Sequence, residues 1–213
     1  NDSTIDSDFA DDNNVIITLS SGQSVTSLDA GLLRNTSIGD FVWHDKNVNG
    51  MQDIGELGIE GVSISLSGQT GTGNLITQNT VTDANGYYNF DGLLPGTYTL
   101  SFSPILGYAF TLSNRDPLDI SDSDVINGEI ANIIVSSGDL LTQYDAGLFQ
   151  RSSIGDFVWE DINCNGIQEI SEPGIMGVNI SLTGTDIFGN NVNLSTNSDI
   201  NRLYSFDQLI PGN

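Results

Sequence analysis

The 213-residue chain has few basic side chains, one cysteine and no long apolar run. Only 5 Lys and Arg residues stand against 28 Asp and Glu residues, for a formal net charge of −23. This charge repels phosphate backbones, which excludes nucleic acid as a partner, and it disfavours anionic membrane surfaces. No apolar stretch approaches the ~20 residues that span a bilayer, so we expect no membrane insertion of this segment.

The scarcity of cysteine also bounds how the fold is stabilised. Cys164 is the only cysteine and has no partner for an intrachain disulfide, so stability must come from packing or from metal. The first residues do not show a basic region followed by an apolar core. We therefore expect no signal peptide here and interpret the stretch as the interior of a longer chain.

The sequence repeats itself without a gap. Ser37 to Trp43 reads SIGDFVW and recurs 116 residues later at Ser153 to Trp159, and about 45 of the 97 overlapping positions are identical, far above chance. We therefore divide the chain into the end of a preceding repeat (1–35), a complete repeat (36–150) and the first part of a following repeat (151–213). Either the stretch is cut from a longer array, which we favour, or the partial ends complete each other between molecules.

Apolar periodicity predicts strands rather than helices. Residues 62–66, 178–182 and 98–102 alternate apolar and polar side chains, which is typical of half-buried strands. Turn sequences such as Asn85-Gly86 separate them. A unit of this size with this spacing predicts an all-β fold of tandem immunoglobulin-like antiparallel β-sandwiches, with Trp43 and Trp159 as core residues.

Two segments match the calcium-loop pattern D-x-[DN]-x-[DN]-G-x₅-E, at residues 45–56 and 161–172. Ca²⁺ takes roughly six to eight hard oxygen ligands, and such a loop supplies side-chain oxygens, one main-chain carbonyl and a closing bidentate Glu. An Asx-rich turn without metal is the alternative. The loops lie between strands, so we describe them as EF-like calcium loops. The predicted ligands are Asp45, Asn47, Asn49, Met51, Asp53, Glu56, Asp161, Asn163, Asn165, Ile167, Glu169 and Glu172.

Other acidic groups form weaker candidate sites. Asp83, Asn85 and Asp91 could hold a metal, although an Asn-Gly hairpin turn explains them at least as well. A second set could bind a cation at a domain junction, with a solvated turn as an equal alternative. It comprises Asp6, Asp8, Asp122, Asp124, Asp29, Asp145, Asp40 and Asp156.

The order of these motifs resembles the B-repeat domains, of the SdrD-B-like and Cna-B type, in bacterial serine-aspartate-repeat surface adhesins. The resemblance rests on IGDFVW, the Asp/Asn/Gly loop, GIEGV at 58–62, TDANGYYNF at 82–90, LPGTY at 94–98 and DAGL at 145–148. It implies tandem calcium-rigidified sandwiches that project something from a cell surface, and metal roles for the loop residues. Related repeats often carry a Lys–Asn isopeptide bond, but the only lysine, Lys46, is Ile162 in the second copy, so we expect none here.

These observations favour a structural, calcium-rigidified module of an extracellular stalk, adhesin or filament. Its expected partners are neighbouring repeats of the same chain, with head-to-tail or lateral self-association into filaments as a further possibility. The alternative is an adhesin module that binds a carbohydrate or a host or partner protein, for which only Tyr87 and Tyr108 offer aromatic candidates. We expect no enzyme, because the single histidine, His44, is replaced by Glu160 in the second copy.

Overall fold

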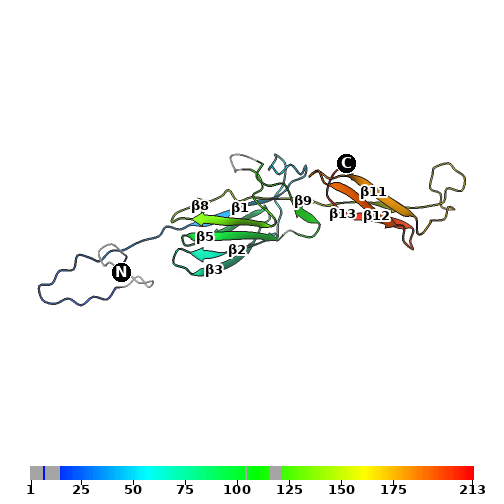
Figure 1. The fold of residues 1–213 in the computed structure, drawn as a ribbon. Helices are drawn as coiled ribbons and strands as arrows, with labels where there is room; N and C mark the ends of the chain where they lie inside the picture. The colour runs from blue at the N-terminus through cyan, green and yellow to red at the C-terminus, as the bar shows by residue number, and fades with distance from the viewer. Residues whose placement is uncertain (1–6, 8–14, 104, 116–120) are drawn as a thin grey trace.

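The computed structural model describes residues 7, 15–103, 105–115 and 121–213, and every regular element in these residues is a β-strand. Figure 1 shows an elongated molecule in which a complete sandwich is followed, end to end, by a smaller set of strands. Residues 15–35 extend away from the sandwich on the opposite side. The all-β prediction is confirmed.

One sheet of the sandwich is built around β1. Its strand order is β4-β1-β9-β6, and β8 also pairs with β1. The strands are β1 (Ser37–His44), β4 (Tyr87–Asp91), β6 (Tyr108–Phe110), β8 (Leu140–Leu141) and β9 (Ala146–Gln150). This sheet is mixed rather than purely antiparallel, because β1 runs parallel to β8 and β9.

The other sheet is antiparallel, in the order β3-β2-β5-β7. Its strands are β2 (Ser63–Thr70), β3 (Leu75–Val81), β5 (Gly96–Ser103) and β7 (Glu129–Val135). Ile64 and Leu66 on β2 and Leu100 on β5 point inward and are almost completely buried, as their alternation with polar residues predicts. Trp43 on β1 is likewise fully buried.

The strands after residue 151 repeat the beginning of the sandwich. They are β10 (Ser152–Phe157), β11 (Asn179–Thr185), β12 (Asn191–Asn197) and β13 (Leu203–Leu209). The β11–β12 hairpin has the same register as β2–β3, and Ile154 pairs with Phe206 as Ile38 pairs with Phe90. The 116-residue offset in sequence is therefore an offset between equivalent structural positions.

Packing differs between the two repeats. Residues 151–213 form the equivalents of β1 to β4, and Ile154 there is 50% exposed, whereas the equivalent Ile38 has no exposed surface. Trp159 is half-buried, whereas the equivalent Trp43 has no exposed surface.

Within the described residues, no helix has the length and apolar character needed to cross a membrane.

Candidate metal centre

The first predicted calcium loop follows β1 at the end of the complete repeat that faces the following repeat. Its first residue, Asp45, is completely buried. The main-chain N–H of Asp45 donates to the carbonyl oxygen of Leu148 on β9 over 2.9 Å, and the hydroxyl of Thr111 donates to Asp45 Oδ2 over 2.6 Å. The loop is thus anchored to segments about 66 and 100 residues further along the chain.

Hydrogen bonds inside this loop order its side chains. The Asp45 carboxylate accepts the N–H groups of Asn49 and Gly50, at 3.3 and 2.7 Å. Glu56, at the last position of the loop, accepts the N–H groups of Lys46 and Asp53, at 2.7 and 3.0 Å. The carboxylates at the first and last positions therefore fix the backbone between them.

Three predicted ligands meet at one point in the same loop. Asn47 Nδ2 and Asn49 Nδ2 each donate to Asp53 Oδ2 over 2.8 Å. The side-chain oxygens of Asn47 and Asn49 accept the N–H groups of Asn49 and Met51, at 3.1 and 2.7 Å. Positions 3, 5 and 9 of the loop are thus within hydrogen-bond distance of a common centre.

The second loop forms the same network. Asp161 accepts the N–H groups of Asn165 and Gly166, at 3.1 and 2.8 Å. Asn163 Nδ2 and Asn165 Nδ2 donate to the two carboxylate oxygens of Glu169, at 2.6 and 2.9 Å. Four further bonds complete the correspondence: Ile162 N and Glu169 N donate to Glu172, Asn165 N donates to Asn163 Oδ1, and Ile167 N donates to Asn165 Oδ1.

The two loops differ in burial, because Asp161 is half-buried whereas Asp45 is completely buried. Backbone angles still agree: φ is +56° at Val48 and +59° at Cys164, and both loops turn at a glycine with positive φ. The loop geometry is therefore set by its own residues.

The donor chemistry of each loop suits a hard cation. Three carboxylates, two Asn side chains and one carbonyl provide only oxygen ligands of the kind Ca²⁺ takes. In the described residues, however, no three His, Cys, Asp or Glu side chains are gathered closely enough to hold a metal ion. In both loops N–H donors bond to the carboxylate oxygens, and the two Asn side chains turn nitrogen toward position 9.

A second group of acidic side chains lies inside the complete repeat. Asp145 is buried, its N–H donates to Asp124 Oδ2 over 2.7 Å, and Asp124 N–H donates to the Asp145 carbonyl over 3.0 Å. Asp145 Oδ1 accepts the N–H of Phe41 over 3.2 Å, beside Asp40 on β1. We refer to Asp40, Asp124 and Asp145 as the acidic cluster.

Electrostatics in the acidic cluster favour bound protons. Burial, followed by the charges of Asp40 and Asp124, raises the pKa of Asp145 to about 8. Burial raises the pKa of Asp40 to about 6. The pKa of Tyr88 is also raised, first by burial and then by the charge of Asp145, and its hydroxyl donates to the Tyr144 carbonyl over 2.6 Å.

This location differs from the expected domain junction. Parallel pairing of β1 with β9 brings Asp40 and Asp145 of the same repeat together, whereas the expectation joined the end of one repeat to the start of the next. Asp122 is buried near the first loop, where Met51 forms an isolated bridge with it. Asp156 and Asp29 are exposed and lie outside the acidic cluster, while Asp6 and Asp8 fall outside the described residues.

The Asp83 candidate forms a hairpin turn. Asp83 Oδ1 accepts the N–H groups of Asn85 and Tyr87 at 2.8 and 2.9 Å, and Gly86 has a φ of +93°. Asp199 makes the same bonds to Asn201 and Leu203 in the following repeat. These contacts support the turn interpretation, and exposed Asp91 at the end of β4 makes none of them.

Sequence reasoning missed the anchors of the first loop. Thr111 belongs to no recognisable motif, and the DAGL motif that contains Leu148 gives no sign of a bond to the loop, because both contacts with Asp45 depend on how distant segments pack. The signal that could have indicated them is the position of Asp45 directly after the buried strand β1, because a buried carboxylate requires hydrogen-bond donors.

A family model described as "SdrD B-like domain" matches residues 36–148 and 152–213. Among curated proteins, serine-aspartate repeat-containing protein F of Staphylococcus epidermidis is 40% identical over 190 residues, which cover 88% of this chain and 10% of that protein. Serine-aspartate repeat-containing protein C of Staphylococcus aureus is 37% identical over 180 residues, covering 83% of this chain and 18% of that protein. The chain thus spans between a tenth and a fifth of these relatives.

Solved structures give weaker matches. A streptococcal ancillary pilin aligns with a TM-score of 0.41 and 14% identity, covering 83% of this chain and 51% of that one. A shaft pilin from Lactobacillus rhamnosus GG aligns with a TM-score of 0.34 and 11% identity, covering 84% of this chain and 83% of that one.

Proposed function

Because this chain belongs to the SdrD B-like domain family, we propose that it is a structural module of an extracellular stalk or filament on a bacterial surface, in which Ca²⁺ rigidifies each repeat. The named relatives are serine-aspartate repeat proteins and the aligned structures are pilins, none of them described as an enzyme. We therefore take a structural role as the starting point, and the experiment below tests whether Ca²⁺ stabilises each repeat.

One observation carries the calcium proposal. Two loops that differ in burial and in their neighbours nevertheless have the same internal hydrogen bonds, with positions 3 and 5 both donating to position 9. A surface turn without a ligand has no need to gather three side chains at one point in both copies. The shared arrangement brings three oxygen-bearing side chains together in each loop, and a cation that replaced the Asn N–H donors beside position 9 would find ligands of the kind that Ca²⁺ takes.

Binding would require the loop to rearrange. Rotation of the Asn47 and Asn49 carboxamides by half a turn would present oxygen instead of nitrogen beside Asp53, at the cost of the bonds that these oxygens accept from Asn49 N and Met51 N. Asp45 and Glu56 would have to move closer to Asp53 to complete the shell. The ion would also offset repulsion between three carboxylates in a loop of a strongly acidic chain. A loop of this modest carboxylate count suits the millimolar calcium of an extracellular setting.

The arrangement of the repeats favours a stalk. β9 ends at Gln150 and β10 begins at Ser152, so only one residue separates strands of successive repeats. The two bodies follow each other along one direction in Figure 1. Repetition of such units would extend the chain lengthwise, which is what a projecting stalk needs.

Calorimetry of the intact chain in calcium and in chelator tests the proposal. A cation bound only by the folded state at a concentration 100-fold above its Kd adds about 2.7 kcal/mol per site, which raises the melting temperature of a repeat of this size by on the order of 10 °C. Isothermal titration should report binding at both loops, and magnesium at the same ionic strength controls for screening. An unchanged melting temperature together with no binding heat would refute the calcium role.

A further inference from the structure

We propose that Phe188 and Arg151 form a repeat-specific joint, in which the ring of Phe188 packs on Phe149 while Arg151 bonds to both repeats and so fixes the orientation of one repeat on the next. The proposal rests on the proposed stalk function, and it assigns the stiffness of the junction to these side chains rather than to calcium.

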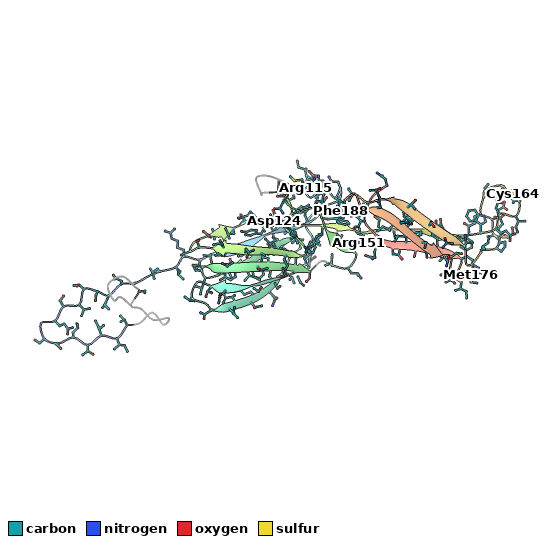
Figure 2. All side chains as sticks on the ribbon, in the orientation of Figure 1. Arg115, Asp124, Arg151, Cys164, Met176 and Phe188 are labelled. Carbon is teal, nitrogen blue, oxygen red and sulfur yellow. The ribbon has the colours of Figure 1, made fainter. Side chains whose placement is uncertain are left out.

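Arg151 is the whole linker between β9 and β10. Its main-chain N–H donates to the Gly107 carbonyl of the complete repeat over 2.8 Å. Its guanidinium Nη1 donates to the Gln208 carbonyl of the following repeat over 3.0 Å. One residue is thus hydrogen-bonded to both bodies, and Figure 2 shows Arg151 and Phe188 where the two bodies meet.

The aromatic contact lies beside this linker. Phe149, the penultimate residue of β9, is 1% exposed, and its ring lies 5.8 Å from the ring of Phe188 at an interplanar angle of 70°. Edge-to-face packing of this kind is a favoured geometry for two aromatic rings. The apolar end of the complete repeat is therefore covered by a side chain of the next one.

The hairpin tip that carries Phe188 is held in shape by one carboxylate. Asp186 Oδ1 accepts the N–H groups of Phe188 and Asn190, at 3.0 and 2.8 Å, and Asp186 Oδ2 accepts from Asn190 Nδ2 at 3.0 Å. Phe188 is therefore presented from a fixed turn. Such a turn places the ring with little freedom before the contact forms.

The joint is specific to this pair of repeats. At the positions 116 residues earlier, where the preceding repeat meets the complete one, the counterparts of Phe149, Phe188 and Arg151 are Leu33, Thr72 and Asn35. Neither the aromatic contact nor the hydrogen bond from a guanidinium at this position can form there. The acceptor of that bond is the main-chain carbonyl of Gln208, which any residue supplies. Successive junctions of the array should therefore differ in stiffness, and the sequence at these three positions sets the difference.

The contacts across the joint do not require a cation. They are two apolar rings and a hydrogen bond from a guanidinium to a neutral carbonyl. The acidic cluster, by contrast, lies within the complete repeat. The orientation of the following repeat relative to the complete repeat should therefore persist when chelator removes calcium.

Distances between spin labels on the intact chain test the joint. Labels on Thr77→Cys in β3 and Ser195→Cys in β12, both at exposed positions, report on the two bodies in a Cys164→Val background. We expect a narrow distance distribution for the unsubstituted joint. Phe188→Thr introduces the residue found at the preceding junction and should widen the distribution about twofold. The reason is that domains joined by a small interface are mobile by default. Arg151→Asn should widen it as well.

Ile200→Thr is the matched control, because it also removes an apolar side chain from an exposed turn of the following repeat, away from the joint, and should leave the distribution unchanged. An unchanged distribution in both Phe188→Thr and Arg151→Asn, with each variant folded by circular dichroism, overturns the proposal. Repeating the measurement in chelator separates the two hypotheses. If the substitutions widen the distance distribution but chelator does not, and calcium does not bind, the joint is supported and the calcium role is refuted. If calcium binds and only chelator widens the distribution, the calcium role is supported and the joint is refuted.

Discussion

The main-chain N–H of Asp45 donates a hydrogen bond to the carbonyl oxygen of Leu148 over 2.9 Å, so the first residue of the candidate calcium loop is tied to the last strand of its repeat. Leu148 is adjacent to Phe149, whose ring packs on Phe188 of the following repeat. The loop, the end of β9 and the junction are therefore consecutive parts of one packed region. Calcium would act on the repeat through this bond, whereas the joint has contacts of its own.

The first prediction concerns the hydroxyl that supports Asp45. Thr111→Val removes the O–H donor 2.6 Å from a fully buried carboxylate, and we expect a loss of about 1–3 kcal/mol in the free energy of unfolding. Urea denaturation in chelator measures it. Thr97→Val, at an exposed position of β5, is the control and should change stability by less than about 0.5 kcal/mol. Equal stabilities of the two variants would show that the Thr111 bond is unimportant.

The second prediction separates the two loops. Glu56→Gln should lower calcium affinity at the first loop by about tenfold or more, because a bidentate carboxylate ligand is lost, and Glu172→Gln should do the same at the second loop only. Titration calorimetry of each variant resolves the sites. Exposed Glu60→Gln, outside the loop, is the control for the change in net charge. If all three variants bind calcium alike, Glu56 and Glu172 are not ligands.

Some of this architecture was predictable because it is local. Alternation placed Ile64 and Leu66 in the core, and a glycine-containing pattern of twelve residues predicted loops whose hydrogen bonds close within the loop itself. Neither requires knowledge of distant partners.

The remainder depends on long-range pairing. Asp40 and Asp145 meet because β1 and β9 run parallel, an arrangement that no local pattern encodes. The contact of Phe149 with Phe188 was missed for another reason. Comparison of the repeats emphasises what they share, and these positions differ between copies.

The third prediction is a pH dependence that follows from the acidic cluster. The folded-state pKa values of Asp145 and Asp40, about 8 and about 6, exceed the ordinary value of 3.8. The folded protein therefore retains protons that the unfolded chain releases, and the free energy of unfolding should fall as pH rises from about 4 to about 8. Melting temperatures in chelator across this range measure the effect.

Asp145→Asn is the matched variant for the pH dependence. It keeps the acceptor for the Phe41 N–H but cannot ionise, so it should flatten the decline and raise stability at pH 8. Asp91→Asn, at an exposed carboxyl at the end of β4, should leave the decline in place. If Asp145→Asn does not reduce the dependence of the free energy of unfolding on pH, that dependence originates outside the acidic cluster.

The last prediction compares two equivalent glycines, Gly58 and Gly174, that follow the two candidate calcium loops. A Cβ at Gly58 would lie 1.7 Å from the carbonyl oxygen of Asn85, which belongs to the backbone of a tight turn and cannot move aside. At Gly174 the closest atoms, at 2.4 and 2.5 Å, are Cγ of Arg202 and Cζ of Phe157. Gly58→Ala should therefore cost about 3 kcal/mol or more, in the upper range for overpacking. Gly174→Ala should cost less, because the atoms that its Cβ meets belong to side chains, which can change rotamer, rather than to backbone. Denaturation measures the loss in free energy of unfolding for each variant. The fluorescence of Trp43 and Trp159, each in a single-tryptophan background, follows the two repeats separately. Equal losses would mean that the backbone turn at Asn85 moves as readily as a side chain.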